Sequence, residues 1–200
     1  MPWEKAGSSM KSREPVSKCI HIIDKLDRII SVSESWLLFA QENQAGESCH
    51  PDKIINRPIW DFIDGDETQQ FYEIILKNIR TEHKTVTLPF RCDAPEKRRY
   101  LELKITPIQQ ENIEFASSII HEELRDAVKI LELGIARSDK LIRMCSMCKK
   151  VELSENTWVE AESAVISLKL FEQSKLPQIS HGLCTECFKL GMSEFEKTFT

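Results

Sequence analysis

The chain has 200 residues, of which 41% are hydrophobic and 30% charged, and its formal net charge is −5. This balance is typical of a folded globular protein and excludes a disordered chain, and the acidic charge argues against nucleic acid or an anionic membrane as partner. No stretch reaches the roughly 20 apolar residues that a membrane-spanning helix needs, and the polar start does not resemble a signal peptide. The sequence therefore predicts a cytoplasmic protein with one large or two small domains.

Five short runs rich in β-branched and aromatic residues predict β-strands in the first 120 residues. They lie at residues 19–23, 28–32, 85–92, 99–108 and 112–118. Between the second and third runs, apolar residues at helical spacing predict helices, one from Trp36 onward, a short one at 58–63 and a longer one from about 64 to 82. Five antiparallel strands with helices on one face form an α+β layer architecture.

This order of elements resembles that of a PAS domain. The resemblance rests on Asp27–Val32, on Arg57–Ile63 and on the final strands. One difference is Ser33, where many PAS domains place an asparagine after the second strand. The resemblance implies a five-stranded sensor domain over residues 18–120, preceded by a flexible tail over 1–17 that has little to bury.

PAS domains often hold a ligand between their sheet and their helices. The sequence does not identify such a ligand, and large aromatic residues also commonly fill a core. The aromatic candidates for a pocket wall are Trp36, Phe39, Trp60, Phe62 and Phe71. Candidates for a haem ligand, by residue type alone, are His21, His50 and His83.

A connecting helix is expected over residues 121–143. Its evidence is an apolar stripe with four-three-four spacing, formed by Leu124, Val128, Leu131 and Ile135. The stripe fits a helix that packs on its own domain, and it fits one that pairs with a second chain; the PAS resemblance implies a homodimer through the 121–136 helix. His121 begins a short match to a kinase phosphoacceptor box, but no phosphate-binding loop follows, so we expect an exposed helix start.

Two C-x-x-C pairs carry the strongest chemical signal. Cys145 and Cys148 form the first, Cys184 and Cys187 the second, and 35 residues separate them. Zinc takes four thiolate or imidazole ligands in a tetrahedron, which two such pairs supply. The gap exceeds the roughly 15–20 residues of a compact zinc pattern, so the segment between must fold as an insert. We predict a small zinc-ribbon-like module over residues 144–200; iron has the same ligand set and is not excluded.

His181 lies three residues before Cys184. With four thiolates available, we expect it to orient a ligand, with direct ligation as the alternative. The segment Ser180–Cys187, together with Cys145–Lys150 and Trp158, is similar to a tail on some bacterial PAS-containing signalling proteins. That resemblance implies a protein partner such as a sensor kinase or a response regulator.

The first hypothesis is therefore a non-enzymatic sensory or adaptor protein of bacterial signal transduction. A closed site of four cysteine ligands leaves no position for a substrate, so catalysis is not expected. The second hypothesis is a thiol redox switch that releases zinc on oxidation. The third is a zinc-ribbon regulator that binds nucleic acid, which the acidic charge disfavours.

Overall fold

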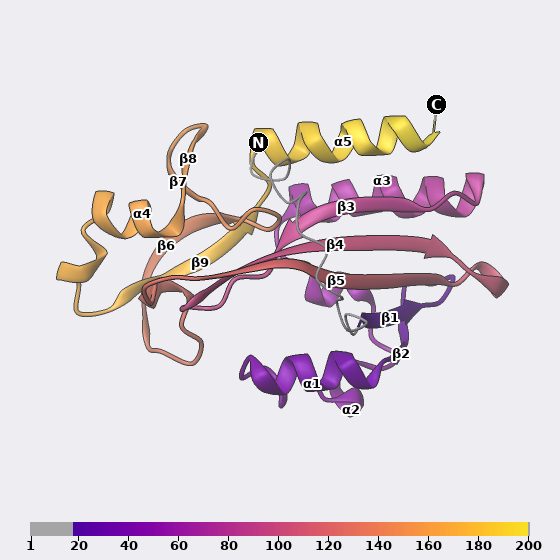
Figure 1. Ribbon diagram of the computed structural model, residues 1–200, viewed down its shortest axis with the longest axis horizontal. Coiled ribbons are helices and arrows are strands. Elements are labelled where there is room, and N and C mark those ends of the chain that lie inside the picture. Colours follow the sequence, from indigo (N-terminus) through magenta and orange to yellow (C-terminus); the bar gives the residue numbers. More distant parts are fainter. Residues whose placement is uncertain (1–17, 200) are drawn as a thin grey trace, which may run out of the picture.

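The computed structural model describes residues 18–199, and their first part is a five-stranded antiparallel sheet with strand order β2-β1-β5-β4-β3 (Figure 1). The predicted tail over 1–17 lies outside the described residues. The strands are β1 (Cys19–Ile23), β2 (Ile29–Val32), β3 (Val86–Arg91), β4 (Lys97–Pro107) and β5 (Ile113–Leu124). The helices of this part are α1 (Glu34–Glu42), α2 (Pro51–Ile54), a 3-10 helix at Ile59–Phe62 and α3 (Asp66–Glu82). The α+β fold predicted from the sequence is confirmed.

Local chemistry explains the first elements. The side chain of Asp24 accepts hydrogen bonds from the backbone N–H groups of Leu26 and Arg28, at 2.8 and 2.9 Å, which closes the β1–β2 turn. Ser33 then accepts from the N–H of Trp36 at 3.2 Å and so caps α1. The residue in which the sequence differs from many PAS domains is therefore the start signal of the next helix.

The inner face of the sheet packs on α3. Leu101, Leu103 and Ile105 alternate along β4 and are buried, while Glu102 and Lys104 between them are exposed. Helical spacing places Phe71, Ile74, Ile75, Leu76 and Ile79 on the inward side of α3, and all of them are buried except Ile74, which is 41% exposed. This arrangement places one continuous core between the sheet and α3.

The prediction of a connecting helix over residues 121–143 is wrong. β5 continues to Leu124, with Arg99 opposite Glu122 and Lys97 opposite Leu124 on β4. A 3-10 turn at Lys129–Leu131 follows, and β6 (Arg137–Cys145) begins inside the predicted helix. Leu124 is 80% exposed, so the residues of the apolar stripe do not share one buried face. The homodimer predicted through 121–136 therefore has no helix to form it, and His121 lies in a strand, not at a helix start.

The second part of the chain is a four-stranded sheet with order β8-β7-β6-β9. Besides β6 it contains β7 (Val151–Ser154), β8 (Thr157–Val159) and β9 (Leu176–Gly182), and its helices are α4 (Ala161–Ser167) and α5 (Thr185–Phe199). β9 runs parallel to β6, which requires the crossover that β7, β8 and α4 provide. A second small core of Val128, Ile130, Met144, Val151 and neighbours lies in this part.

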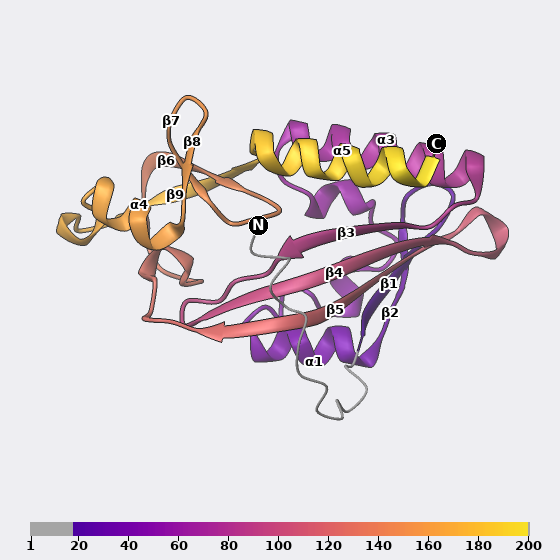
Figure 2. The same cartoon turned by 45° about the horizontal axis from the view of Figure 1, so that its top comes forward.

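The two parts share a boundary along α3 and the edge strand β3. Figure 2 shows α5 lying beside α3 and β3, and these elements are in contact. Gly65, before α3, has φ +89°, and a Cβ there would come closer than 3.0 Å to the backbone carbonyl of His181 in β9. Gly65 takes the N-cap position of α3, and neither of its acidic neighbours, Asp64 and Asp66, caps the helix. The glycine lets the start of α3 approach the second sheet.

Among the described residues, no helix is long and apolar enough to cross a membrane.

Candidate metal centre

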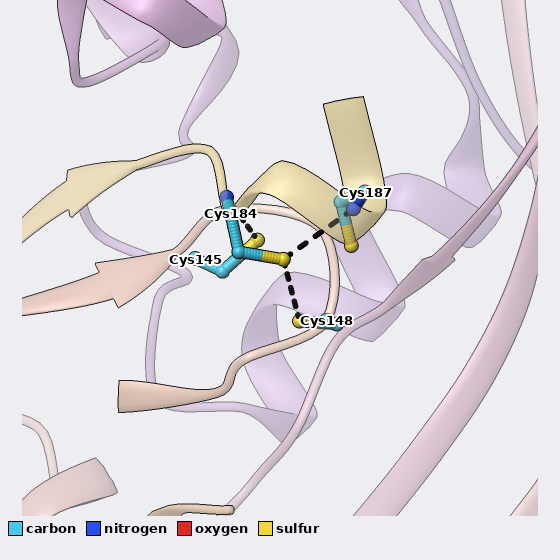
Figure 3. Close-up of side chains that lie close together, drawn as sticks. All are labelled: Cys145, Cys148, Cys184 and Cys187. Atoms are coloured by element: carbon cyan, nitrogen blue, oxygen red, sulfur yellow. Dashed lines mark hydrogen bonds between the residues drawn. The ribbon is translucent and has the colours of Figure 1, made fainter. Parts of the chain in front are cut away.

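The two C-x-x-C pairs meet at one point. Cys145 is the last residue of β6 and Cys148 closes the turn that follows, whereas Cys184 follows β9 and Cys187 lies in the first turn of α5. Their four sulfur atoms lie within 4.8 Å of one another, and all four residues are buried (Figure 3). The ligand set predicted from spacing is thus assembled in space. The second pair starts a helix, whereas a ribbon would place it in another turn between strands.

Backbone N–H groups point at the sulfur atoms. The N–H of Cys184 donates to the Sγ of Cys145 at 3.4 Å, and the N–H of Cys187 donates to the Sγ of Cys184 at 3.4 Å. Hydrogen bonds to a charged group favour its charged form. The N-terminus of α5 adds a positive dipole end next to Cys187. The surroundings therefore favour thiolates, the form of cysteine that binds metal.

The thiols also compete with one another. The pKa of the Cys145 thiol is lowered because the thiols of Cys148, Cys184 and Cys187 hydrogen-bond to its sulfur. The pKa values of Cys148 and Cys187 are raised, first by hydrogen bonding with Cys145. Hydrogen bonding with Cys145 raises the pKa of Cys184, but hydrogen bonding of the Cys148 and Cys187 thiols to its sulfur outweighs this effect, so the pKa of Cys184 is lowered. The cluster therefore favours ionisation of Cys145 and Cys184 over that of Cys148 and Cys187, and a bound cation would favour ionisation of all four. The donor set, four buried sulfurs around a common centre, fits a soft divalent metal such as zinc.

The first pair is held by the chain around it. The N–H of Cys145 donates to the carbonyl of Lys150 at 2.8 Å, and that of Lys149 to the carbonyl of Cys145 at 3.0 Å. Lys149 has φ +60°, the left-handed conformation that closes the turn. The N–H of Ser146 donates to the carbonyl of Gly182 at 2.8 Å, which joins this turn to the end of β9.

The metal centre is also joined directly to the first sheet. The N–H of Arg91, at the end of β3, donates to the carbonyl of Met147 at 2.7 Å. Thr68 of α3 and Ser146 share a hydrogen bond between their hydroxyls at 3.1 Å. All four cysteines belong to the same hydrophobic core as Phe71, Val86 and Leu88. The site is therefore built into the core of the first part, and the predicted module does not stand apart from it.

His181 does not complete the ligand set. It lies on β9, and its Nδ1 is 3.4 Å from the Oδ2 of Asp64. Burial lowers its pKa, and the nearby charge of Lys149 lowers it further. The structure thus places its imidazole against the carboxylate that precedes α3, and the cluster of potential ligands contains cysteines alone.

The five candidate pocket aromatics do not line one cavity. Trp36 faces His21, Phe39 lies under the guanidinium of Arg99, and Phe62 is 42% exposed. Phe71 is 1% exposed, in the core. Trp60 donates from its indole N–H to Asp27, and both residues line an open groove of about 440 Å³ together with residues of α3. These are Glu73, Leu76, Lys77, Arg80 and Thr81.

The three candidate haem histidines have structural positions. His50 caps α2 by accepting from the N–H of Asp52 at 3.4 Å, and His83 ends α3 with φ +54°. His21 stacks on Phe115 at 4.5 Å between ring centroids and meets Trp36 edge-on at 5.1 Å. Aromatic rings therefore cover His21 on both sides.

Burial lowers the pKa of His21 from 6.5 to about 4. Between pH 6.5 and about pH 4, His21 is protonated in the unfolded chain but stays neutral in the folded chain. The free energy of unfolding therefore falls as the pH drops through this window. At pH 5 we expect a loss of about 1–2 kcal/mol from this residue. Urea unfolding at pH 7 and pH 5 measures the loss, and His21→Phe should reduce it by that amount. An unchanged pH dependence in the variant would contradict the assignment.

Three glycines and a buried ion network have no signature in the sequence. Gly65, Gly182 and Gly191 each allow a close approach that a Cβ would block, and Arg91 and Asp93 form a buried ion pair. The Ser-His-Gly segment before Cys184 is a visible motif, but nothing in it reveals that Gly182 lies against the side chain of Arg143. Charge and glycine content alone do not show such contacts.

The fold is an α+β domain with a five-stranded antiparallel sheet, and a cluster of four cysteines that could hold a metal ion is built into its core. The PAS domain family matches residues 17–124, so the chain belongs to this family. The match ends with β5, and the cysteine cluster lies beyond it.

The other comparisons add little. No curated protein matches the chain. Among solved structures, it is similar to a domain of an HTR-like protein from Haloarcula marismortui ATCC 43049, with 16% sequence identity and a TM-score of 0.34. That alignment covers 52% of this chain and 98% of the other.

Proposed function

We propose that the chain is a non-enzymatic sensory or regulatory protein of signal transduction, in which a PAS domain is fused to a four-cysteine zinc centre. The observation that carries the proposal is the set of four buried sulfurs, which lie within 4.8 Å of one another inside the core that the PAS domain also uses. A signal that alters either part can reach the other through this core. The output is binding to a protein partner in the cytoplasm, such as a sensor kinase.

Metal content tests the proposal. Protein purified without added metal should contain about one zinc ion per chain. Cobalt should replace it and give the visible absorption of a tetrahedral thiolate site. Cys148→Ser should abolish stoichiometric binding, whereas Cys49→Ser, outside the cluster, should leave it unchanged. Protein without metal, or protein with iron, would contradict the zinc assignment.

A redox switch is the second candidate. The sulfurs of Cys148 and Cys184 lie 3.8 Å apart, so after metal loss two thiols could be oxidised to one disulfide while a peroxide is reduced to water. Burial opposes this reaction, because oxidants reach exposed thiolates first. Zinc release at a low peroxide dose would favour the switch, and zinc retention would favour a structural site.

The ion pairs of the structure disfavour nucleic-acid binding. Arg91 pairs with Asp93 and Glu160, and Arg99 with Glu122. Arg98 is likewise held by Glu160 and Glu162. These arginines are committed to carboxylates within the protein and do not form a free basic face.

A further inference from the structure

The open groove beside α3 is a cavity that the metal centre does not use. Its volume of about 440 Å³ falls within the roughly 300–1,000 Å³ of sites for small molecules. Its lining comes from α3, from Trp60 in the 3-10 helix and from Asp27 in the turn between β1 and β2. None of these residues belongs to a strand of the PAS sheet, so the groove differs from the space between sheet and helices that the PAS resemblance indicated as a pocket.

One wall of the groove is held in place by hydrogen bonds. The carboxylate of Asp27 accepts from the indole N–H of Trp60 at 3.2 Å and from Nη2 of Arg80 at 2.6 Å. Arg80 also donates to the carbonyl of Asp24 at 3.1 Å, and the side chain of Gln69 donates to the carbonyl of Trp60 at 3.2 Å. The Trp60 ring is therefore oriented before any ligand binds, which lowers the entropy cost of binding.

The apolar surface of the groove comes from Trp60 and Leu76. Leu76 lies within the PAS core, and Trp60 is partly buried against it. Close packing of that core fixes both side chains. An aromatic ring fits such a surface well, because it can stack on the indole ring at little further cost.

Two opposite charges of α3 face no partner in the protein. Glu73 and Lys77 are exposed, and they lie one helical turn apart on the face of α3 that also carries Leu76 and Arg80. Within residues 18–199 neither forms an ion pair. The charge of Arg80, by contrast, is balanced by Asp27. The groove is thus neutral as a whole, with one free carboxylate and one free ammonium group beside its apolar surface.

We propose that this groove binds a zwitterion that carries an aromatic ring, of the class of the aromatic α-amino acids. The ring contacts Trp60 and Leu76, the ammonium group pairs with Glu73, and the carboxylate pairs with Lys77. A neutral groove does not attract a ligand with net charge, whereas two neighbouring opposite charges complement the two ends of a zwitterion. The Cβ atoms of residues four apart on a helix are about 5–6 Å apart. Both charged groups of an α-amino acid are bonded to one carbon, so a single molecule can contact both side chains.

This ligand is the signal of the proposed sensory function, and the inference rests on that function in this respect alone. None of the four cysteines lines the groove, so binding does not need the metal.

Isothermal titration calorimetry of the full-length chain with L-phenylalanine tests the inference. We expect a Kd of about 1 mM or tighter, as is common for ligands of this size. Three related compounds each lack one recognised group: hydrocinnamate lacks the ammonium group, phenethylamine lacks the carboxylate, and L-alanine lacks the ring. Each should bind at least about tenfold more weakly. A weaker Kd for L-phenylalanine, or equal affinity for L-alanine, would overturn the inference.

Two exposed substitutions separate the roles of the two charges without disturbing the core. Glu73→Gln should weaken binding of L-phenylalanine at least about tenfold and leave hydrocinnamate unchanged, since that compound has no ammonium group. Lys77→Gln should weaken L-phenylalanine equally and leave phenethylamine unchanged. The matched controls Glu82→Gln and Lys140→Gln remove exposed charges outside the groove and should bind as wild type. Equal affinity of wild type and Glu73→Gln for L-phenylalanine would overturn the inference, and so would equal losses in the controls.

Zinc content is measured on the same samples. A chain that binds L-phenylalanine and holds no zinc would refute the zinc centre and leave the groove assigned. A chain that holds zinc and does not bind L-phenylalanine would refute this inference and leave the zinc centre in place.

Discussion

Removal of the proposed zinc ion is expected to free the backbone amide of Arg91, although Arg91 is not among the proposed ligands. Its N–H donates to the carbonyl of Met147, which lies between Cys145 and Cys148. Structural zinc contributes apparent free energies of about 10–16 kcal/mol in small zinc domains, which is as large as the roughly 5–15 kcal/mol that stabilises a whole protein. Without it, the cysteine turn and the start of α5 should open, and β3 loses its hydrogen-bond partner.

Hydrogen exchange with and without a chelator measures this effect. In the chelator-treated protein we expect faster exchange, by at least about a hundredfold, at the amides of Arg91, 144–150 and 183–199. Amides in the β4–β5 ladder should keep their protection, since their partners lie within the PAS sheet. The Cys148→Ser chain should show the same pattern without chelator, and Cys49→Ser should respond as wild type. Unchanged protection at Arg91, or loss throughout the β4–β5 ladder, would contradict this coupling between the metal centre and β3.

The sequence was informative where structure depends on neighbours along the chain. Strand β4 follows from the alternation of Leu101, Leu103 and Ile105, and the period of two needs no tertiary knowledge. The cysteine cluster was expected from the chemistry of thiolates, because two C-x-x-C turns can supply the four ligands of one tetrahedral site. The site residues could therefore be named before their geometry was known.

The sequence failed where contacts distant along the chain decide the outcome. Residues 121–124 extend strand β5 because they pair with β4, where Lys97 and Arg99 form ion pairs with Glu122. The apolar spacing that indicated a helix does not depend on this pairing and so could not predict it. The contact of Gly191 with Phe71 joins residues more than a hundred positions apart. A local pattern cannot show that the metal module and the PAS domain share one core.

The second large effect is expected at Asp93, a carboxylate with no exposed surface on its side chain. It pairs with Arg91, whose side chain is 4% exposed, and with Arg125 at 3.2 Å. Its hydrogen bonds and charge, with those of Glu160, raise the pKa of the Arg91 guanidinium despite burial, which lowers it. Asp93→Ala would leave two buried guanidinium groups without this partner, and breaking such a pair from one side costs about 3–5 kcal/mol.

Urea unfolding measures this loss, with Glu47→Ala as the control. Glu47 also pairs with a cation, Lys53 at 3.1 Å, but its side chain is 95% exposed, so its removal should cost less than about 1 kcal/mol. The Asp93 network has a further consequence, because Arg91 also binds Glu160 at 2.8 Å and Arg125 binds Glu162 at 2.9 Å, at the start of α4. Asp93→Ala should therefore also speed amide exchange in α4, the helix between β8 and β9 of the four-stranded sheet. Equal costs for the two variants would show that the buried charges find water or new partners, and that the ion network does not hold the two sheets together.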